Sequence, residues 1–232
     1  MEKSPAPKRS TGLFDHPDAH AAYDRVHGVV SHESDRGAVL ISAAEVDGQL
    51  RRLIEAGAPT DMTSEERKRV FSYPGPLSSF AARADVAFTT RLISRRLFSA
   101  ITHLRQLRND VAHSPETFRL ADHLDRVRGI FETGNDMPYW INRLTVEAQV
   151  KGIVNSMLQI EDPVDPTTAA FGSPGAALDY LAERPDLTAI LEDRRPRFEL
   201  ALGVSILCAL IINHREAAHI RSRADAPDGG AA

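Results

Sequence analysis

Three polar residues near the middle of the chain, Arg108, Asn109 and His113, have the types and spacing needed to handle a phosphate group. An arginine can bind two phosphate oxygens at once, and a histidine can exchange a proton near neutral pH. Cleavage of RNA through its 2′-hydroxyl needs a base, an acid and a group that stabilises the developing charge. Arg108 as phosphate clamp, His113 as acid/base and Asn109 as support would meet these needs.

The helix predicted to carry these residues separates two of them. Asn109 and His113 are four residues apart and share a face with Arg105. Arg108 lies five residues before His113, which is about 140° around the helix. The two side chains can therefore act on one phosphate only if the arginine reaches around the helix or if a second copy of the chain supplies one of them. A catalytic interpretation thus predicts a homodimer.

The same residues also have a purely structural interpretation. Ser114 precedes Pro115, which disfavours a helical conformation at Ser114, so the helix is predicted to end at His113. The negative end of the helix dipole and the nearby Asp110 both favour a positively charged His113. Such a histidine can simply cap the last carbonyl groups of the helix. The residues alone leave both interpretations open.

An arginine-rich stretch leads up to these residues, because no acidic residue occurs between Val86 and Asn109. Its further candidates for binding an anionic partner are Arg91, Arg95, Arg96 and Arg105. The whole chain has a net charge of −4, so contact with nucleic acid would depend on a local basic surface of this kind. The neighbouring aromatic residues, Phe88 and Phe98, are placed for the core, which argues against sequence-specific reading of bases.

No metal site and no cofactor are predicted elsewhere in the chain. Four titratable residues fall on one side of the first predicted helix: His16, His20, Asp24 and His27. No second cluster is spaced to complete a zinc site, so a solvated or partner-binding face is the favoured interpretation. The single cysteine, Cys208, lies in an apolar run and is expected to be an inert buried thiol.

The hydrophobic pattern is helical nearly everywhere, and strand signals are almost absent. Helices are predicted over residues 17–31, 35–56, 64–71, 76–92, 94–113, 118–131, 139–158 and 196–221. On these helices Glu45, Asp47 and Arg83 are expected to form a buried carboxylate–arginine pair. The predicted fold class is therefore all-α, a bundle of about seven to eight helices.

Breaks in the helical pattern predict the domain organisation. Residues 1–14 and 224–232 are expected to be disordered tails, residues 15–132 a helical core, and residues 133–223 a helical C-terminal extension. The Pro- and Gly-rich segment 161–175 is predicted to be a loop. The single cysteine, the lack of a signal-peptide pattern and an apolar run too short for a bilayer predict a cytoplasmic protein with no membrane contact.

The order and spacing of three segments resemble the mannitol operon repressor family of bacterial helical proteins. The segments are RGAVLISAAEVDGQLRRLI (36–54), GPLSSFAARADVAF (75–88) and LRQLRNDVAHS (104–114), with further similarity in RRPRFELALGVSIL (194–207). The resemblance implies an all-helical, HEPN-like fold and a role in transcriptional repression through other regulators. Segment 104–114 also resembles the signature of the wider HEPN group, in whose nuclease members the matching Arg and His cut RNA without metal, usually across a dimer.

Two functions are compatible with these residues and with the resemblance. The first is a regulatory interaction protein, a transcriptional repressor or co-repressor that binds a protein partner and has no evident DNA-reading element of its own. The alternative is a metal-independent endoribonuclease of HEPN type that acts on RNA as a dimer. Whether the protein is an enzyme depends on which of these holds.

Overall fold

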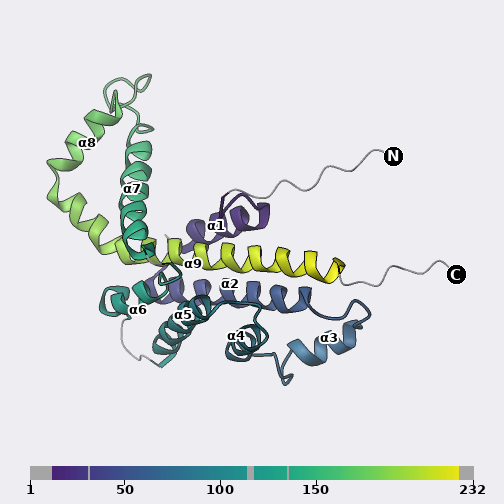
Figure 1. Cartoon of the computed structure of the whole chain (residues 1–232). Helices are drawn as coiled ribbons and strands as arrows, with labels where there is room; N and C mark the ends of the chain where they lie inside the picture. The colour runs from purple at the N-terminus through teal and green to yellow at the C-terminus, as the bar shows by residue number, and fades with distance from the viewer. Residues whose placement is uncertain (1–11, 31, 114–117, 135, 225–232) are drawn as a thin grey trace, which may run out of the picture.

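The computed structural model describes residues 12–30, 32–113, 118–134 and 136–224. Within these ranges the chain forms nine α-helices and one short 3-10 helix, with no strand, which confirms the all-α class (Figure 1). The helices are α1 (Pro17–Val30), α2 (Asp35–Ala56), α3 (Ser64–Phe71), α4 (Phe80–Thr89), α5 (Arg95–His113), η1 (Leu120–His123), α6 (Leu124–Gly129), α7 (Met137–Met157), α8 (Pro174–Ala182) and α9 (Pro185–Ala224). The predicted helix stop at Ser114-Pro115 and most of the predicted tails lie outside the described residues.

Local capping explains where several helices begin. Thr63 and Glu66 form a reciprocal capping box at α3, in which the Glu66 N–H donates to Thr63 Oγ1 (3.2 Å) and the Thr63 N–H donates to Glu66 Oε2 (2.9 Å). The Ala82 N–H donates to Ser79 Oγ (3.1 Å) at the start of α4. The prediction that this helix begins at Pro76 was therefore wrong, because the serine cap lies three residues further along.

The second half of the chain departs most from the predicted helix boundaries. Residues 174–182 form α8, where no helix was predicted. The last helix begins at Pro185 and runs through Pro196, which the sequence predicts to be its first residue. A proline inside a helix removes one backbone hydrogen bond and favours a bend, and α9 changes direction along its course in Figure 1. The single helix predicted over 118–131 is instead η1 followed by the short α6.

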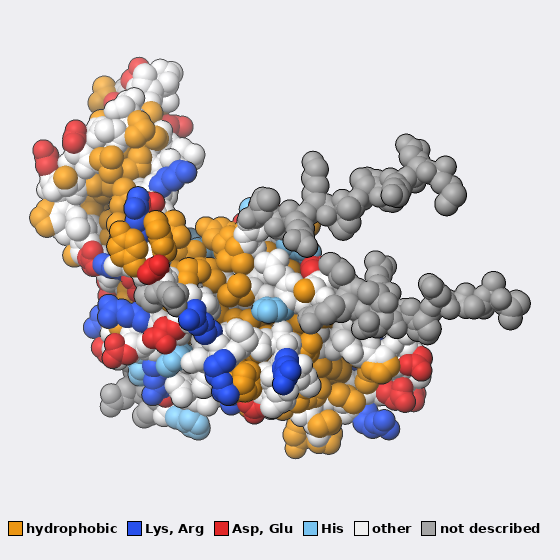
Figure 2. Space-filling model, in the orientation of Figure 1, with side chains coloured by type: hydrophobic (Ala, Val, Ile, Leu, Met, Phe, Trp, Pro, Cys, Tyr) orange, Lys and Arg blue, Asp and Glu red, His pale blue; other side chains and the backbone are white. Residues whose placement is uncertain are grey.

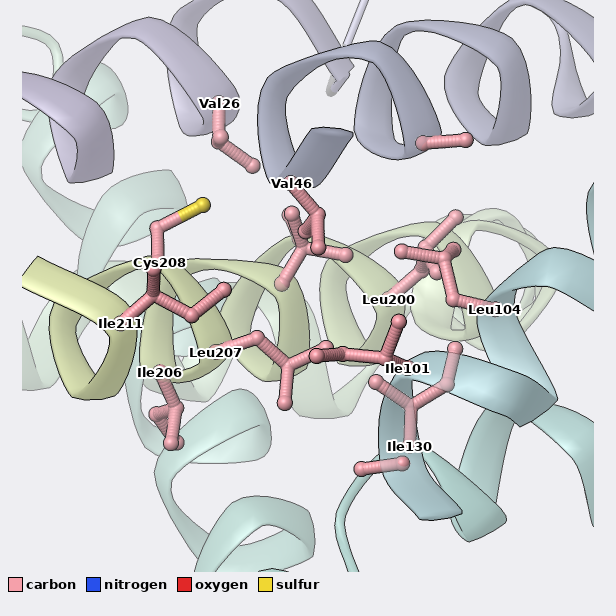
Figure 3. Close-up of a cluster of buried hydrophobic side chains, with 14 of the residues drawn as sticks. Val26, Val46, Ile101, Leu104, Ile130, Leu200, Ile206, Leu207, Cys208 and Ile211 are labelled. Atoms are coloured by element: carbon pink, nitrogen blue, oxygen red, sulfur yellow. The ribbon is translucent and has the colours of Figure 1, made fainter. Parts of the chain in front are cut away.

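The core is built around the second part of α9, which lies between α1 and α2 (Figure 1). Side chains of α1, α2, α5 and α9 meet there, with Ile130 just after α6, as Figure 3 shows: Val26, Val46, Ile101, Leu104, Ile130, Leu200, Leu207 and Ile211. Two residues assigned to the N-terminal tail from the sequence, Leu13 and Phe14, pack against this core. The predicted core and the predicted C-terminal extension therefore contribute to one hydrophobic cluster.

A separate lobe projects from one end of the bundle formed by α1, α2, α5 and the second part of α9 (Figure 1). We call it the α7–α8 arm and define it as residues 137–195, which comprise α7, α8, the loop between them and the first part of α9. It has a small hydrophobic cluster of its own, centred on Val154, Met157 and Ala177. The space-filling view in Figure 2 shows hydrophobic side chains gathered over its surface.

Helix α9 is apolar enough, over Pro185–Ala218, to match a membrane span by length and composition. However, 72% of its most apolar window is buried inside the protein, as in the core helices of globular proteins. Cys208 lies in this buried part and is fully inaccessible, and its burial raises the pKa of the thiol well above the usual range. This agrees with the expected inert thiol.

Candidate functional site

Helix α5 presents the polar residues singled out from the sequence on its solvent side. Its core-facing side buries the apolar stripe of Leu97, Ile101, Leu104, Leu107 and Val111. Asn109 and His113 lie on the side of the helix away from this stripe, whereas Arg108 lies beside the stripe, one turn after Leu104; all three are exposed. His113 is therefore not buried against core carbonyl groups.

A pocket of about 520 Å³ lies beside the last turns of α5, between α2 and the start of α4. Arg105, Arg108 and Asn109 all line it. These residues are three and four positions apart, which is the spacing of side chains that share one helix face. His113 is not among the lining residues, so the structure groups Arg108 with Arg105 and Asn109 and leaves His113 one turn beyond them.

The carboxylate that lines this pocket, Asp47, is held by an arginine from α4. Arg83 donates from Nε and Nη2 to the two oxygens of Asp47 (2.7 and 2.6 Å). It also donates from Nη1 to the carbonyl oxygen of Leu77 (2.6 Å). The predicted carboxylate–arginine pair is confirmed for Asp47, whereas Glu45 pairs with Arg25 instead (2.9 Å).

The C-terminal end of α5 has partners that its sequence did not indicate. Arg36 of α2 donates to the carbonyl oxygen of Val111 (2.8 Å), so an arginine from another helix satisfies part of the helix end. Asp110 forms an ion pair with Arg126 and lies 3.8 Å from Nδ1 of His123. Asp110 thus interacts with α6 and η1.

The four arginines predicted to bind an anion do not form one surface. Arg105 joins the pocket beside α5, where its Nη1 atom is 3.9 Å from an oxygen of Asp85. Arg91 and Arg95 line a second pocket of about 530 Å³. The guanidinium of Arg95 lies over the ring of Phe88, 4.0 Å from its centre. Arg96 is exposed and lines neither pocket.

The histidines of α1, and His16 just before it, have different neighbours and do not converge. Nε2 of His16 is 3.6 Å from Glu216, and Nε2 of His20 is 3.6 Å from Asp24 on the same helix. His27 packs against the ring of Tyr23, with centroids 4.2 Å apart and the ring planes tilted by 36°. In the described part of the chain, no group of three or more such side chains is arranged to hold a metal ion.

We expect His27 to make the stability of the protein depend on pH. Burial lowers the pKa of His27 from its usual 6.5, and the nearby carboxylate of Asp24 only partly opposes this. The unfolded chain then binds this proton more readily than the folded chain. The full contribution to stability is present above pH 6.5 and is lost as the pH falls through the lower pKa of the folded state. Urea unfolding at a series of pH values measures this slope.

The matched comparison is between two neutral replacements on α1. His27→Gln is expected to flatten the dependence of the unfolding free energy on pH below 6.5 more than His20→Gln, which replaces an exposed histidine on the same helix. An unaltered slope in His27→Gln would show that another group causes it.

Several residues of the pocket beside α5 were not recognised in the sequence. Leu40 and Ala44 on α2 and Ser78 before α4 form much of its wall. Leu40, Ala44 and Asp47 have the four-and-three spacing of one helix face, so their proximity to each other is a local signal. No local pattern places that face opposite Arg108.

Comparison with models of protein families, with curated proteins and with solved structures finds no match to this chain. The resemblance to the mannitol operon repressor family and to the HEPN signature stays a prediction from the three segments that carry it.

Proposed function

We propose that this protein is a regulatory interaction protein that binds a protein partner, in the manner expected of a transcriptional co-repressor in the cytoplasm. The observation that carries the proposal is the apolar surface of the α7–α8 arm (Figure 2). Large exposed hydrophobic patches on soluble proteins commonly mark sites of protein–protein contact.

The exposed hydrophobic side chains are concentrated on this arm. Of the twelve large ones in the described residues, all except Val29, Leu40 and Tyr73 belong to residues 137–195, which leaves nine on the arm. Tyr139 and Trp140 are 64% and 47% exposed at the start of α7, and aromatic residues are enriched where proteins bind each other. The arm therefore has the composition of a binding surface.

A pocket of about 530 Å³ on the arm supports a specific kind of partner. Its lining is apolar, with Ile153, Met157, Phe171 and Ile190 among its residues, and it also includes the exposed Arg194. An apolar helix face that carries an acidic residue at its edge would fit both features. We therefore expect the partner, a transcription regulator, to insert such a segment here.

The test compares two glutamate substitutions at hydrophobic positions of similar exposure. Ile190→Glu changes the arm pocket, and Val29→Glu changes α1 (49% and 41% exposed). Proteins bound to the full chain in cells are identified by mass spectrometry, and the purified regulator found in this way is then titrated by calorimetry. The proposal expects that the wild type and Val29→Glu bind it and that Ile190→Glu binds at least about tenfold more weakly. Equal binding by all three, or enrichment of no transcription regulator, would overturn the proposal.

A second candidate, the HEPN-type ribonuclease, is supported by one observation. Arg108, Asn109 and His113 are all accessible to a substrate, as a nuclease would require. Because His113 lies outside the pocket that contains Arg108, cleavage would need Arg108 to reach around the helix or a homodimer in which one copy supplies the histidine. Purified protein incubated with RNA in a chelator tests this, with His113→Ala and, as the control, His32→Ala at another exposed histidine. Cleavage lost only in His113→Ala would support the nuclease, and no cleavage by the wild type would exclude it.

A further inference from the structure

The pocket between α2, α4 and α5 has the size of a binding site for a small molecule. Its volume is about 520 Å³, within the range of roughly 300–1,000 Å³ usual for such sites. Its walls come from three separate segments of the chain: residues 40–47 of α2, residues 78–81 at the start of α4, and residues 105–109 of α5. Helices α2, α4 and α5 pack against one another, so the cavity is part of the bundle.

One side of this pocket is positively charged. Arg108 is exposed, and its Nη1 atom lies 3.5 Å from the side-chain oxygen of Asn109. The contact of Arg105 with Asp85 is long (3.9 Å). The side chain of Asp85 is 60% exposed, so water screens its charge. Both guanidinium groups can thus turn toward a ligand without breaking a close ion pair.

The one carboxylate in the lining does not cancel this charge. Asp47 accepts two hydrogen bonds from Arg83, whose side chain is only 9% exposed, so its negative charge is already neutralised. A ligand that enters the pocket therefore meets two arginines, of which Arg105 has a long, solvent-exposed contact with Asp85 (3.9 Å). The favoured ligand group is an anion that can accept several hydrogen bonds.

The opposite side of the pocket is apolar and formed largely by small side chains. Ala43, Ala44 and Ala81 leave the space open, and Leu40 and Phe80 complete the apolar surface. An inorganic ion would leave this surface in contact with water. A ligand with an apolar group of a few carbon atoms would cover it and gain hydrophobic free energy in proportion to the area buried.

We propose that this pocket binds a small organic anion, in which a phosphate or carboxylate group contacts Arg105, Arg108 and Asn109 and an apolar group lies against Ala44 and Phe80. The site is independent of the partner surface on the α7–α8 arm. An RNA chain is a different ligand, because its phosphates would follow the exposed arginines without filling the hollow.

Binding is measured by titration calorimetry with the full chain and four probes: phenyl phosphate, benzoate, hexanoate and inorganic phosphate. The proposal expects saturable binding of at least one organic anion, at least about tenfold tighter than that of inorganic phosphate. Comparison of phenyl phosphate with benzoate shows whether the head group is a phosphate or a carboxylate. No saturable binding of any organic probe at millimolar concentration would overturn the proposal.

Three variants test whether the ligand binds in this pocket. Arg108→Met removes charge from the rim and should weaken binding about tenfold or more, since a hydrogen bond to a charged group contributes roughly that factor. Ala44→Phe fills the apolar side of the pocket. It should weaken binding of the organic anion and leave binding of inorganic phosphate unchanged. Arg96→Met, an exposed arginine on the same helix that does not line the pocket, should bind like the wild type.

Two patterns would contradict the proposal. If Ala44→Phe binds the organic anion as tightly as the wild type, the ligand does not occupy the hollow. A single-stranded RNA oligonucleotide could instead bind more tightly than every organic probe. If Arg108→Met weakens that binding and Ala44→Phe leaves it unchanged, the arginines form a surface that binds polyanions. Thermal unfolding of each variant without ligand checks that its fold is intact.

Discussion

Replacing Arg83 by methionine is expected to lower the free energy of unfolding by about 2–4 kcal/mol. The substitution leaves the carboxylate of Asp47 partly buried without the two hydrogen bonds that compensate its charge, and the loss of one partner of such a pair is strongly destabilising. It also removes the hydrogen bond to the carbonyl group of Leu77, which holds the segment before α4. Chemical denaturation followed by circular dichroism measures the change.

The control for this prediction is an arginine in an exposed pair. Arg143→Ala breaks the pair with Glu147 on α7 (2.7 Å), in which both side chains are more than half exposed, so a much smaller change in the free energy of unfolding than for Arg83→Met is expected. The double variant Arg83→Met/Asp47→Leu should recover much of the lost stability, because no charge is left unpaired. If Arg83→Met is no more destabilising than Arg143→Ala, the pair contributes little to the fold.

Replacing Gly203 by alanine is expected to lower the free energy of unfolding by about 1–3 kcal/mol, although alanine is the better helix former. Gly203 lies in α9, and a methyl group at this position would overlap the ring of Phe131, which is itself buried in the core. The absence of a side chain lets α9 pack closely against the segment that follows α6. The ring or the helix must therefore move to accept the added carbon.

A second glycine provides the matched control for this substitution. Gly152→Ala in α7 adds the same methyl group where nothing lies within 4 Å, so it should raise the free energy of unfolding by up to about 1 kcal/mol. Urea unfolding of both variants gives the comparison. The double variant Gly203→Ala/Phe131→Leu replaces the ring by a smaller side chain. It should recover part of the stability lost in Gly203→Ala. If the two alanine variants change stability in the same direction, the close contact with Phe131 does not limit the packing.

Much of the helical architecture could be predicted because its signals are local. The structure confirms the helices predicted over 64–71 and 94–113, and the features that stabilise them, the Thr63–Glu66 capping box of α3 and the apolar stripe of α5, each lie within one or a few turns. The errors arose where packing overrides local preference. A proline usually begins or breaks a helix, yet α9 continues through Pro196. The second part of α9 is held between α1 and α2 by the hydrophobic core.

The candidate site was predictable only in part, and the reason lies in sequence distance. That Asn109 and His113 face solvent follows from their position opposite a buried stripe, which the sequence by itself determined, whereas Arg108 lies beside that stripe and its exposure is seen only in the structure. Only the tertiary structure decided which of them act together, because the walls of the pocket come from residues 40–47 and 78–81, far from α5 in the chain. Helical periodicity specifies which side chains share a face, whereas the neighbour across that face depends on how the helices pack.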